Sequence, residues 1–230
     1  MIKVFITGFP HCGTTILRKI IGNSSKVFDV IKEHTSISNN LLLNQCYNSH
    51  IVFKQPYYIK KLNSIIKPNY KYCDKRIFIL RNPRFVFSSL NFRFKNTDYF
   101  FNNSIKQENH SFSLFEECCE MFNFYKNLND KTTLAIKYEE LFINNFENLK
   151  KIFNFIGLEF KEDFISNERI GFIHSSDPLV IENNPHLKLR TSQINSKFEY
   201  LDCDSKINLS KEQENYITKS NKVKLVYPFI

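Results

Sequence analysis

The opening residues carry the pattern that most constrains the fold of this chain. An apolar run over residues 2–7 ends at Gly8, and residues 14–21 then repeat apolar side chains every three or four positions before Gly22. A short apolar run rich in β-branched residues predicts a buried strand, and the longer period predicts an amphipathic helix. We therefore expect a strand, a glycine-bounded loop and a helix, the unit from which parallel α/β folds are built.

The loop between Gly8 and Gly13 has the spacing of a phosphate-binding loop, in which backbone N–H groups and a helix N-terminus face an anion. A nucleoside-triphosphate loop continues with Lys and then Ser or Thr, which bind the phosphates and Mg²⁺. Here Thr14 and Thr15 follow Gly13, and no acidic residue ends the strand predicted over 76–80. The loop therefore suits one phosphate or sulfate-like group better than ATP or GTP, although an unliganded turn has the same pattern.

Strand and helix patterns alternate along the rest of the chain. The alternation predicts a mainly parallel sheet with helices on both faces, a three-layer α/β sandwich. The loops that follow Thr7, Ile31, Phe53 and Leu80 should then gather at one sheet edge, where such folds bind ligands. We predict strands over 2–7, 27–31, 50–54, 76–80 and 132–136, and helices over 14–21, through 41–43, and over 57–66, 84–94, 114–128, 146–156 and 209–226.

Composition narrows the class of protein. A chain of 230 residues with 42% apolar content fits one domain over 1–230. The six cysteines lack metal-like spacing, so we expect reduced thiols and no metal. The N-terminal apolar run is too short for a signal peptide or a membrane span, which favours a cytoplasmic location.

The formal net charge of +9 indicates either an anionic partner or lysines spread over a solvated surface. Nucleic acid, an acidic membrane surface and a nucleotide-like polyanion all fit that charge. The chain shows no basic-aromatic array of the kind that binds nucleic acid, so we expect no nucleic-acid partner.

The loop resembles the first cofactor motif of the sulfotransferases that use 3′-phosphoadenosine-5′-phosphosulfate (PAPS), which reads approximately Pro-Lys-Ser-Gly-Thr-Thr. Pro10, Gly13, Thr14 and Thr15 match it, while His11 replaces Lys and Cys12 replaces Ser. The resemblance implies a P-loop-like sulfotransferase fold in which these six residues bind the 5′-phosphosulfate, with Cys12 acting through its backbone amide. Because a histidine is only partly cationic near neutral pH, His11 bears on catalysis more than on binding.

A second resemblance begins at Arg81, where a predicted strand ends. In the family an Arg at this place and a Ser eight positions later bind the 3′ phosphate, and Ser89 stands eight positions after Arg81. An Arg fork suits phosphate oxygens, and two helical turns return the Ser to the side of the strand end. Ser88 is an alternative to Ser89, and an ordinary surface ion pair is an alternative role for Arg81.

A third stretch, from Tyr138 through Gly157, resembles the family's Tyr-Glu-Asp/Glu-Leu segment and the helix that follows it. The resemblance places Tyr138 near the adenine of the cofactor, although an amphipathic Tyr at a helix entrance has the same pattern. Glu139 and Glu140 are expected to cap and orient structure. The resemblance fades after about residue 160, and Arg190 is only a further candidate cation for the 3′ phosphate.

Sulfuryl transfer requires a base for the acceptor proton and positive charge near the bridging oxygen, and it requires no metal. The segment Phe53-Lys54-Gln55-Pro56 lacks the His of the small-molecule branch and is closer to the Lys-Ser/Thr-Pro of the carbohydrate branch, which uses a Glu after the second strand. Glu33 stands at that place. We therefore expect Glu33 as base and Lys54 near the sulfuryl group. His34 is the alternative base, and a surface ion pair is the alternative role for Glu33.

These patterns predict a sulfotransferase that moves a sulfuryl group from PAPS to a hydroxyl or amine and releases 3′,5′-adenosine bisphosphate (PAP). Carbohydrate, lipid and small-molecule acceptors all stay open, as does the oligomeric state. The alternatives are a nucleotide or nucleoside kinase, a non-catalytic PAPS-binding module, and a basic nucleic-acid binder.

Overall fold

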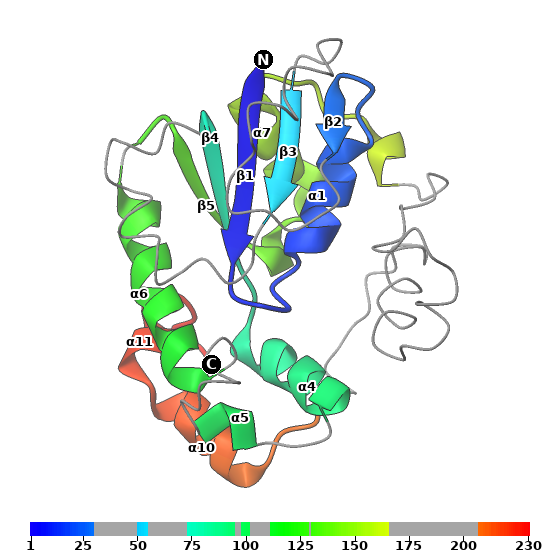
Figure 1. Ribbon diagram of the computed structural model, residues 1–230. Coiled ribbons are helices and arrows are strands. Elements are labelled where there is room, and N and C mark those ends of the chain that lie inside the picture. The colour runs from blue at the N-terminus through cyan, green and yellow to red at the C-terminus, as the bar shows by residue number, and fades with distance from the viewer. Residues whose placement is uncertain (30–49, 55–72, 95–97, 102–110, 129, 166–206) are drawn as a thin grey trace, which may run out of the picture.

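Five parallel strands form the centre of the computed structural model, which describes residues 1–29, 50–54, 73–94, 98–101, 111–128, 130–165 and 207–230 (Figure 1). The spatial order is β2-β3-β1-β4-β5. This confirms the predicted parallel sheet. The strands are β1 (Ile2–Gly8), β2 (Val27–Asp29), β3 (His50–Lys54), β4 (Lys75–Leu80) and β5 (Thr133–Lys137).

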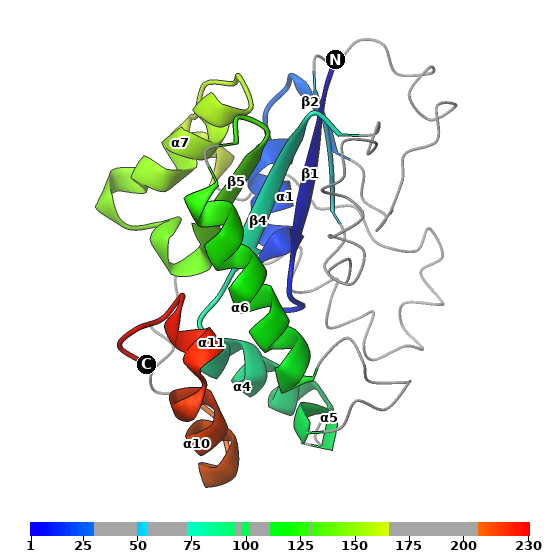
Figure 2. The same ribbon diagram turned by 90° about the vertical axis from the view of Figure 1, so that its left-hand side faces the viewer.

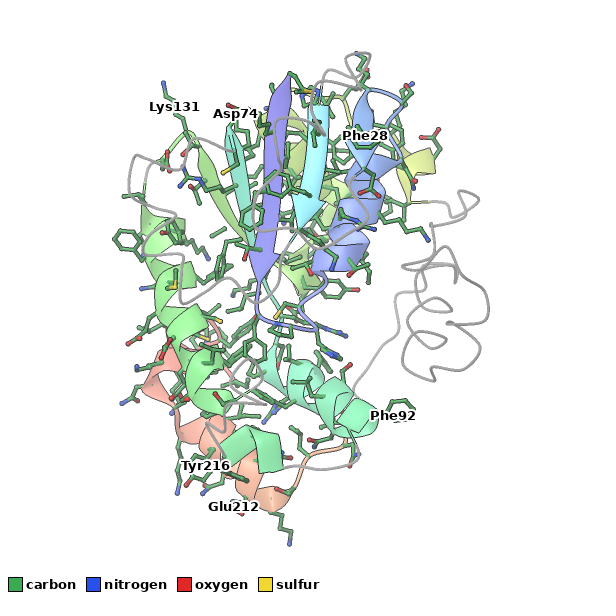
Figure 3. All side chains as sticks on the ribbon, in the orientation of Figure 1. Phe28, Asp74, Phe92, Lys131, Glu212 and Tyr216 are labelled. Carbon is green, nitrogen blue, oxygen red and sulfur yellow. The ribbon has the colours of Figure 1, made fainter. Side chains whose placement is uncertain are left out.

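The central strand β1 pairs with β3 on one side and with β4 on the other, both in parallel register. Ile6 is opposite Lys54, and Gly8 is opposite Ile79. The described strand ends therefore lie at the same sheet edge, as predicted from the sequence. Asp74 and Lys131 lie at the opposite edge (Figure 3).

Helices cover both faces of the sheet. Val4 and Ile6 pack with α1 (Thr14–Gly22) and α7 (Glu147–Phe155), while Phe5 packs on the face that carries α6 (Phe112–Asn127). Successive side chains of a strand point to opposite faces, which is why neighbouring residues of β1 enter different cores. Figure 2 shows α6 and α7 on different sides of the sheet, the predicted three-layer arrangement.

A helical layer lies beyond the carboxyl edge of the sheet (Figure 1). An aromatic cluster joins it to the glycine-bounded loop of residues 8–13, because the Phe87 ring lies 5.8 Å from Phe9 and 4.7 Å from Phe100, centroid to centroid. The layer contains α4 (Pro83–Phe94), α5 (Asp98–Phe101), α10 (Lys211–Lys219) and α11 (Asn221–Lys224), and the short 3₁₀ helices are η1 (Tyr138–Glu140), η2 (Asn144–Phe146) and η3 (Glu162–Phe164).

The prediction of one continuous helix over 209–226 is wrong. The chain breaks at Ser220, whose hydroxyl donates to Glu116 at 2.6 Å and accepts the Val223 N–H at 3.2 Å, so this residue caps a new helix. Helix α5 was not predicted. The helices predicted through 41–43 and over 57–66 lie outside the described residues. Within the described ranges, no helix has the length and apolar character needed to cross a bilayer.

Phe87 offers a test of the aromatic cluster, because its side chain is fully buried. Phe87→Ala should lower the free energy of unfolding by about 3–5 kcal/mol, since it leaves a cavity among rings that cannot collapse fully. Phe92, on the same helix, is 71% exposed and projects outward (Figure 3), so Phe92→Ala should change stability by less than about 0.5 kcal/mol. Urea denaturation of both variants measures the two free energies of unfolding. Equal decreases in the two variants would contradict the buried packing of Phe87.

Candidate functional site

The glycine-bounded loop of residues 8–13 adopts a backbone that suits an anion. His11 and Gly13 both have left-handed backbone angles, with φ of 64° and 90°, and Gly13 is the N-cap of α1. Such turns before a helix create a concave set of backbone N–H groups, and the first N–H groups of a helix have no intrahelical partner. The first turn of α1 contains no acidic residue, so nothing in that turn repels an anion.

Cys12 shapes this loop from inside the core. Its side chain is buried, burial raises the pKa of its thiol, and its N–H donates to the carbonyl of Phe9 at 3.2 Å. Pro10 is also buried, while Thr14 is buried and Thr15 is half-buried at the start of α1. The described geometry leaves the N–H groups and hydroxyls of Thr14 and Thr15 as better candidates for anion contacts than the thiol or the N–H of Cys12.

A short contact joins this loop to the segment from Arg81 to Ser89. His11 Nδ1 lies 2.7 Å from the hydroxyl oxygen of Ser89. The hydroxyl donates when Nδ1 is unprotonated and accepts when it carries a proton. Ser88 instead accepts the N–H of Asn208 at 2.7 Å and so ties α4 to the segment before α10. Of the two candidate serines, Ser89 is therefore the one that the fold brings to the loop.

Arg81 follows β4 at the same edge and lies against aromatic rings. Its guanidinium carbon is 4.8 Å from the ring centroid of Tyr138 and 5.5 Å from that of Phe85. The Tyr138 ring also packs against Gly13 so closely that a Cβ there would overlap it. The structure thus brings Arg81, Tyr138, Ser89 and the loop together.

Glu139 fixes the turn between β4 and α4, a contact that the sequence did not reveal. Its Oε1 accepts the N–H of Asn82 at 2.6 Å, and Asn82 Oδ1 in turn accepts the N–H of Arg84 at 3.0 Å. Burial raises the pKa of Glu139, although the Asn82 hydrogen bond and the nearby charge of Arg81 oppose the shift. The Tyr138-Glu139 pair could be recognised in the sequence. Its contact with Asn82, 57 positions earlier, could not be predicted from the sequence.

Lys54 lies in a buried group of charges beside the loop. Its side chain is only 1% exposed, and Arg18 of α1 pairs with Asp29 of β2 at 3.1 Å between Nε and Oδ1. Burial raises the pKa of Asp29, while the positive charges of Arg18 and Lys54 oppose that rise. Arg18 and Asp29 were not predicted to belong to this group of charges. The available signal in the sequence was a charged residue on an otherwise apolar face.

The candidate bases Glu33 and His34, together with Arg190, lie outside the described residues. Among the residues that the structure does describe, no group of three or more His, Cys, Asp or Glu side chains is placed to hold a metal ion.

Comparisons with known proteins identify the family. The family model described as "Sulfotransferase domain" matches residues 2–176. The chain belongs to the sulfotransferase domain family. Two similar solved structures are the sulfotransferase domain from the curacin biosynthetic pathway and mouse sulfotransferase SULT7A1 complexed with PAP. The curacin-pathway domain has a TM-score of 0.57 and 14% identity, and the alignment covers 94% of this chain and 95% of that one. Mouse SULT7A1 has a TM-score of 0.58 and 14% identity, and the alignment covers 99% of this chain and 88% of that one.

The sulfotransferase domain from the Synechococcus PCC 7002 olefin synthase is similar to the same degree, with a TM-score of 0.56 and 14% identity over 96% of this chain and 95% of that one. No curated protein matches the sequence. At this identity the solved structures confirm the sulfotransferase fold.

The buried carboxylate of Glu139 predicts a pH-dependent stability difference. Because the pKa of Glu139 is raised in the folded protein from its ordinary 4.5, ionisation costs more when folded than when unfolded. The difference in free energy of unfolding, wild type minus Glu139→Gln, should therefore favour the wild type most below about pH 4.5. That difference should decrease as the pH rises through the raised pKa of Glu139. Urea denaturation of both proteins from pH 4 to 7, at about half-unit steps, measures it. A difference that stays constant over this range would contradict the burial effect.

Proposed function

We propose that this sulfotransferase uses PAPS as sulfuryl donor and transfers the group to a hydroxyl or amine of a small-molecule, lipid or carbohydrate acceptor. The observation that carries the proposal is the contact between the loop and the second motif, where His11 Nδ1 lies 2.7 Å from the Ser89 hydroxyl. PAPS has an anionic group at each end of its ribose. The loop of residues 8–13 suits one of these anionic groups, and Arg81 with Ser89 suits the other.

For the 5′ end of the donor, the proposal assigns the turn from Pro10 to Thr15. The left-handed residues His11 and Gly13 curve the backbone, and Thr14 and Thr15 supply N–H groups and hydroxyls at the start of α1. Cys12 contributes to the shape of the loop rather than a side-chain contact, because its thiol is in the core. His11 takes the place of the family's lysine and bears a positive charge only when protonated.

For the 3′ phosphate, the proposal assigns Arg81 and Ser89, with Tyr138 beside them. A guanidinium fork binds phosphate oxygens through two parallel hydrogen bonds, and a serine hydroxyl adds one donor. The complex of mouse SULT7A1 with PAP is consistent with use of the same nucleotide here.

For the chemistry, we assign Glu33 as general base, with His34 as the alternative, and Lys54 as the cation near the bridging oxygen. Glu33 takes the proton of the acceptor hydroxyl or amine as a new bond forms from the acceptor oxygen or nitrogen to sulfur. The bond from sulfur to the bridging phosphate oxygen breaks, and PAP leaves with the electron pair. Lys54 is suited to stabilising the charge on that oxygen because water is largely excluded from its surroundings.

Calorimetry without Mg²⁺ tests the donor. PAP should bind the wild type, and Arg81→Met should weaken PAP binding about 10- to 100-fold, since hydrogen bonds to a charged group contribute about 1.5–3 kcal/mol. Arg84→Met is the matched control, because Arg84 is paired with Glu214 of α10. Its effect should be less than about 3-fold. Binding of ATP that requires Mg²⁺, with no binding of PAP, would overturn the proposal in favour of a kinase.

Acceptor screening with labelled PAPS, followed by substitution, tests the base. Glu33→Gln should lower kcat about 10²- to 10⁴-fold and leave PAP affinity unchanged, because a general base acts on the acceptor proton alone. His34→Asn serves as the comparison. Full activity in Glu33→Gln with loss in His34→Asn would transfer the role to His34. Absence of turnover over a broad acceptor panel, despite PAP binding, would favour a non-catalytic module.

A further inference from the structure

The contacts of Tyr138 place it between the two ends of the proposed nucleotide site. We infer that Tyr138 is a positioning residue: its ring holds Arg81 at a fixed place relative to the phosphate loop, so that it strengthens binding of the 3′ phosphate through Arg81. The inference rests on the proposed use of PAPS. It differs from the role expected from the sequence, in which Tyr138 contacts the adenine.

The first contact is with the loop. The ring of Tyr138 fills the space beside Gly13, where any Cβ would overlap the ring carbons Cδ2 and Cε2. Gly13 also has a φ of 90°, which side-chain-bearing residues rarely adopt. The ring is therefore packed directly against the backbone that begins α1, and a movement of either one displaces the other.

The second contact is with Arg81. The guanidinium carbon lies 4.8 Å from the centroid of the Tyr138 ring, within the range of a cation–π interaction. An arginine side chain has many rotamers in solution, and binding loses affinity when that freedom must be removed. An aromatic ring under the guanidinium removes part of it before the ligand arrives.

Tyr138 is itself held in place. Its ring meets that of Phe142 edge to face, with centroids 5.7 Å apart, and it begins the short helix η1 directly after β5. The next residue, Glu139, accepts the N–H of Asn82 at 2.6 Å, and Asn82 directly follows Arg81. Two successive residues therefore fix one arginine, one through its side chain and the other through the adjacent backbone.

The two roles for Tyr138 make different predictions about ligands. A contact with adenine contributes equally to PAP and to 5′-AMP, which lacks the 3′ phosphate. A role through Arg81 contributes to PAP and leaves 5′-AMP almost unaffected. The ratio of the two dissociation constants therefore separates the roles.

Calorimetry with PAP and 5′-AMP should compare the wild type with Tyr138→Phe, Tyr138→Leu, Arg81→Met and the double variant Arg81→Met/Tyr138→Leu. We expect Tyr138→Leu to weaken PAP binding about 10-fold and 5′-AMP binding less than 2-fold, with Tyr138→Phe near the wild type. In the Arg81→Met background, Tyr138→Leu should cause no additional loss of PAP affinity. Tyr216→Leu is the control for removal of a half-exposed ring from α10, and it should leave both affinities unchanged.

Equal weakening of PAP and 5′-AMP in Tyr138→Leu would overturn the inference in favour of an adenine contact, and unchanged affinity for both would overturn it as well. Losses that add in the double variant would also contradict action through Arg81. If Tyr138→Leu does not fold, Tyr138→Met keeps an apolar side chain of similar reach and takes its place. Failure of the wild type to bind PAP is a separate result, because it removes the proposed function itself.

Discussion

The parallel pairing of β1 with both β3 and β4 is the constraint on which the rest of the site depends. It aligns the ends of three strands, so the loop of residues 8–13, Lys54 and Arg81 meet at one edge although they are far apart in the sequence. Parallel strands require crossover connections that cover the faces of the sheet. The same connections leave the carboxyl edge as the place where polar backbone and charged side chains gather.

The positive charges at this edge of the sheet are balanced by carboxylates that the fold partly buries. Asp29 lies beside Arg18 and Lys54, and Glu139 lies beside Arg81. Burial of an ionised group is costly unless hydrogen bonds and opposite charges offset it, which explains why each carboxylate has both a cation and a fixed donor or ion-pair partner. These carboxylates hold the cations in place and leave net positive character for an anionic ligand.

Local patterns predicted the parts of the fold that depend on neighbouring residues. The strands and α1 follow from periodicity, and the structure confirms these elements. The eight-residue step from Arg81 to Ser89 came instead from the resemblance to the family's second motif. The rest depends on distant partners. At the break, the Ser220 hydroxyl bonds Glu116 of α6, and Glu139 bonds the N–H of Asn82. Helix α5 has four residues, too few to show a period. Glu33, the proposed base, lies outside the described residues, so the structure does not test that prediction.

The two chain ends lie at opposite ends of the sheet (Figure 1). Met1 precedes the start of β1 and is 54% exposed, whereas Tyr227 is buried with its ring 5.1 Å from Nζ of Lys137, the last residue of β5. A tether attached at Met1, such as a fusion partner or a linker to a solid support, would therefore leave the carboxyl edge facing away from its anchor. A tether at Ile230 would instead leave the protein on the same side of the sheet as the strand ends that carry Lys54 and Arg81.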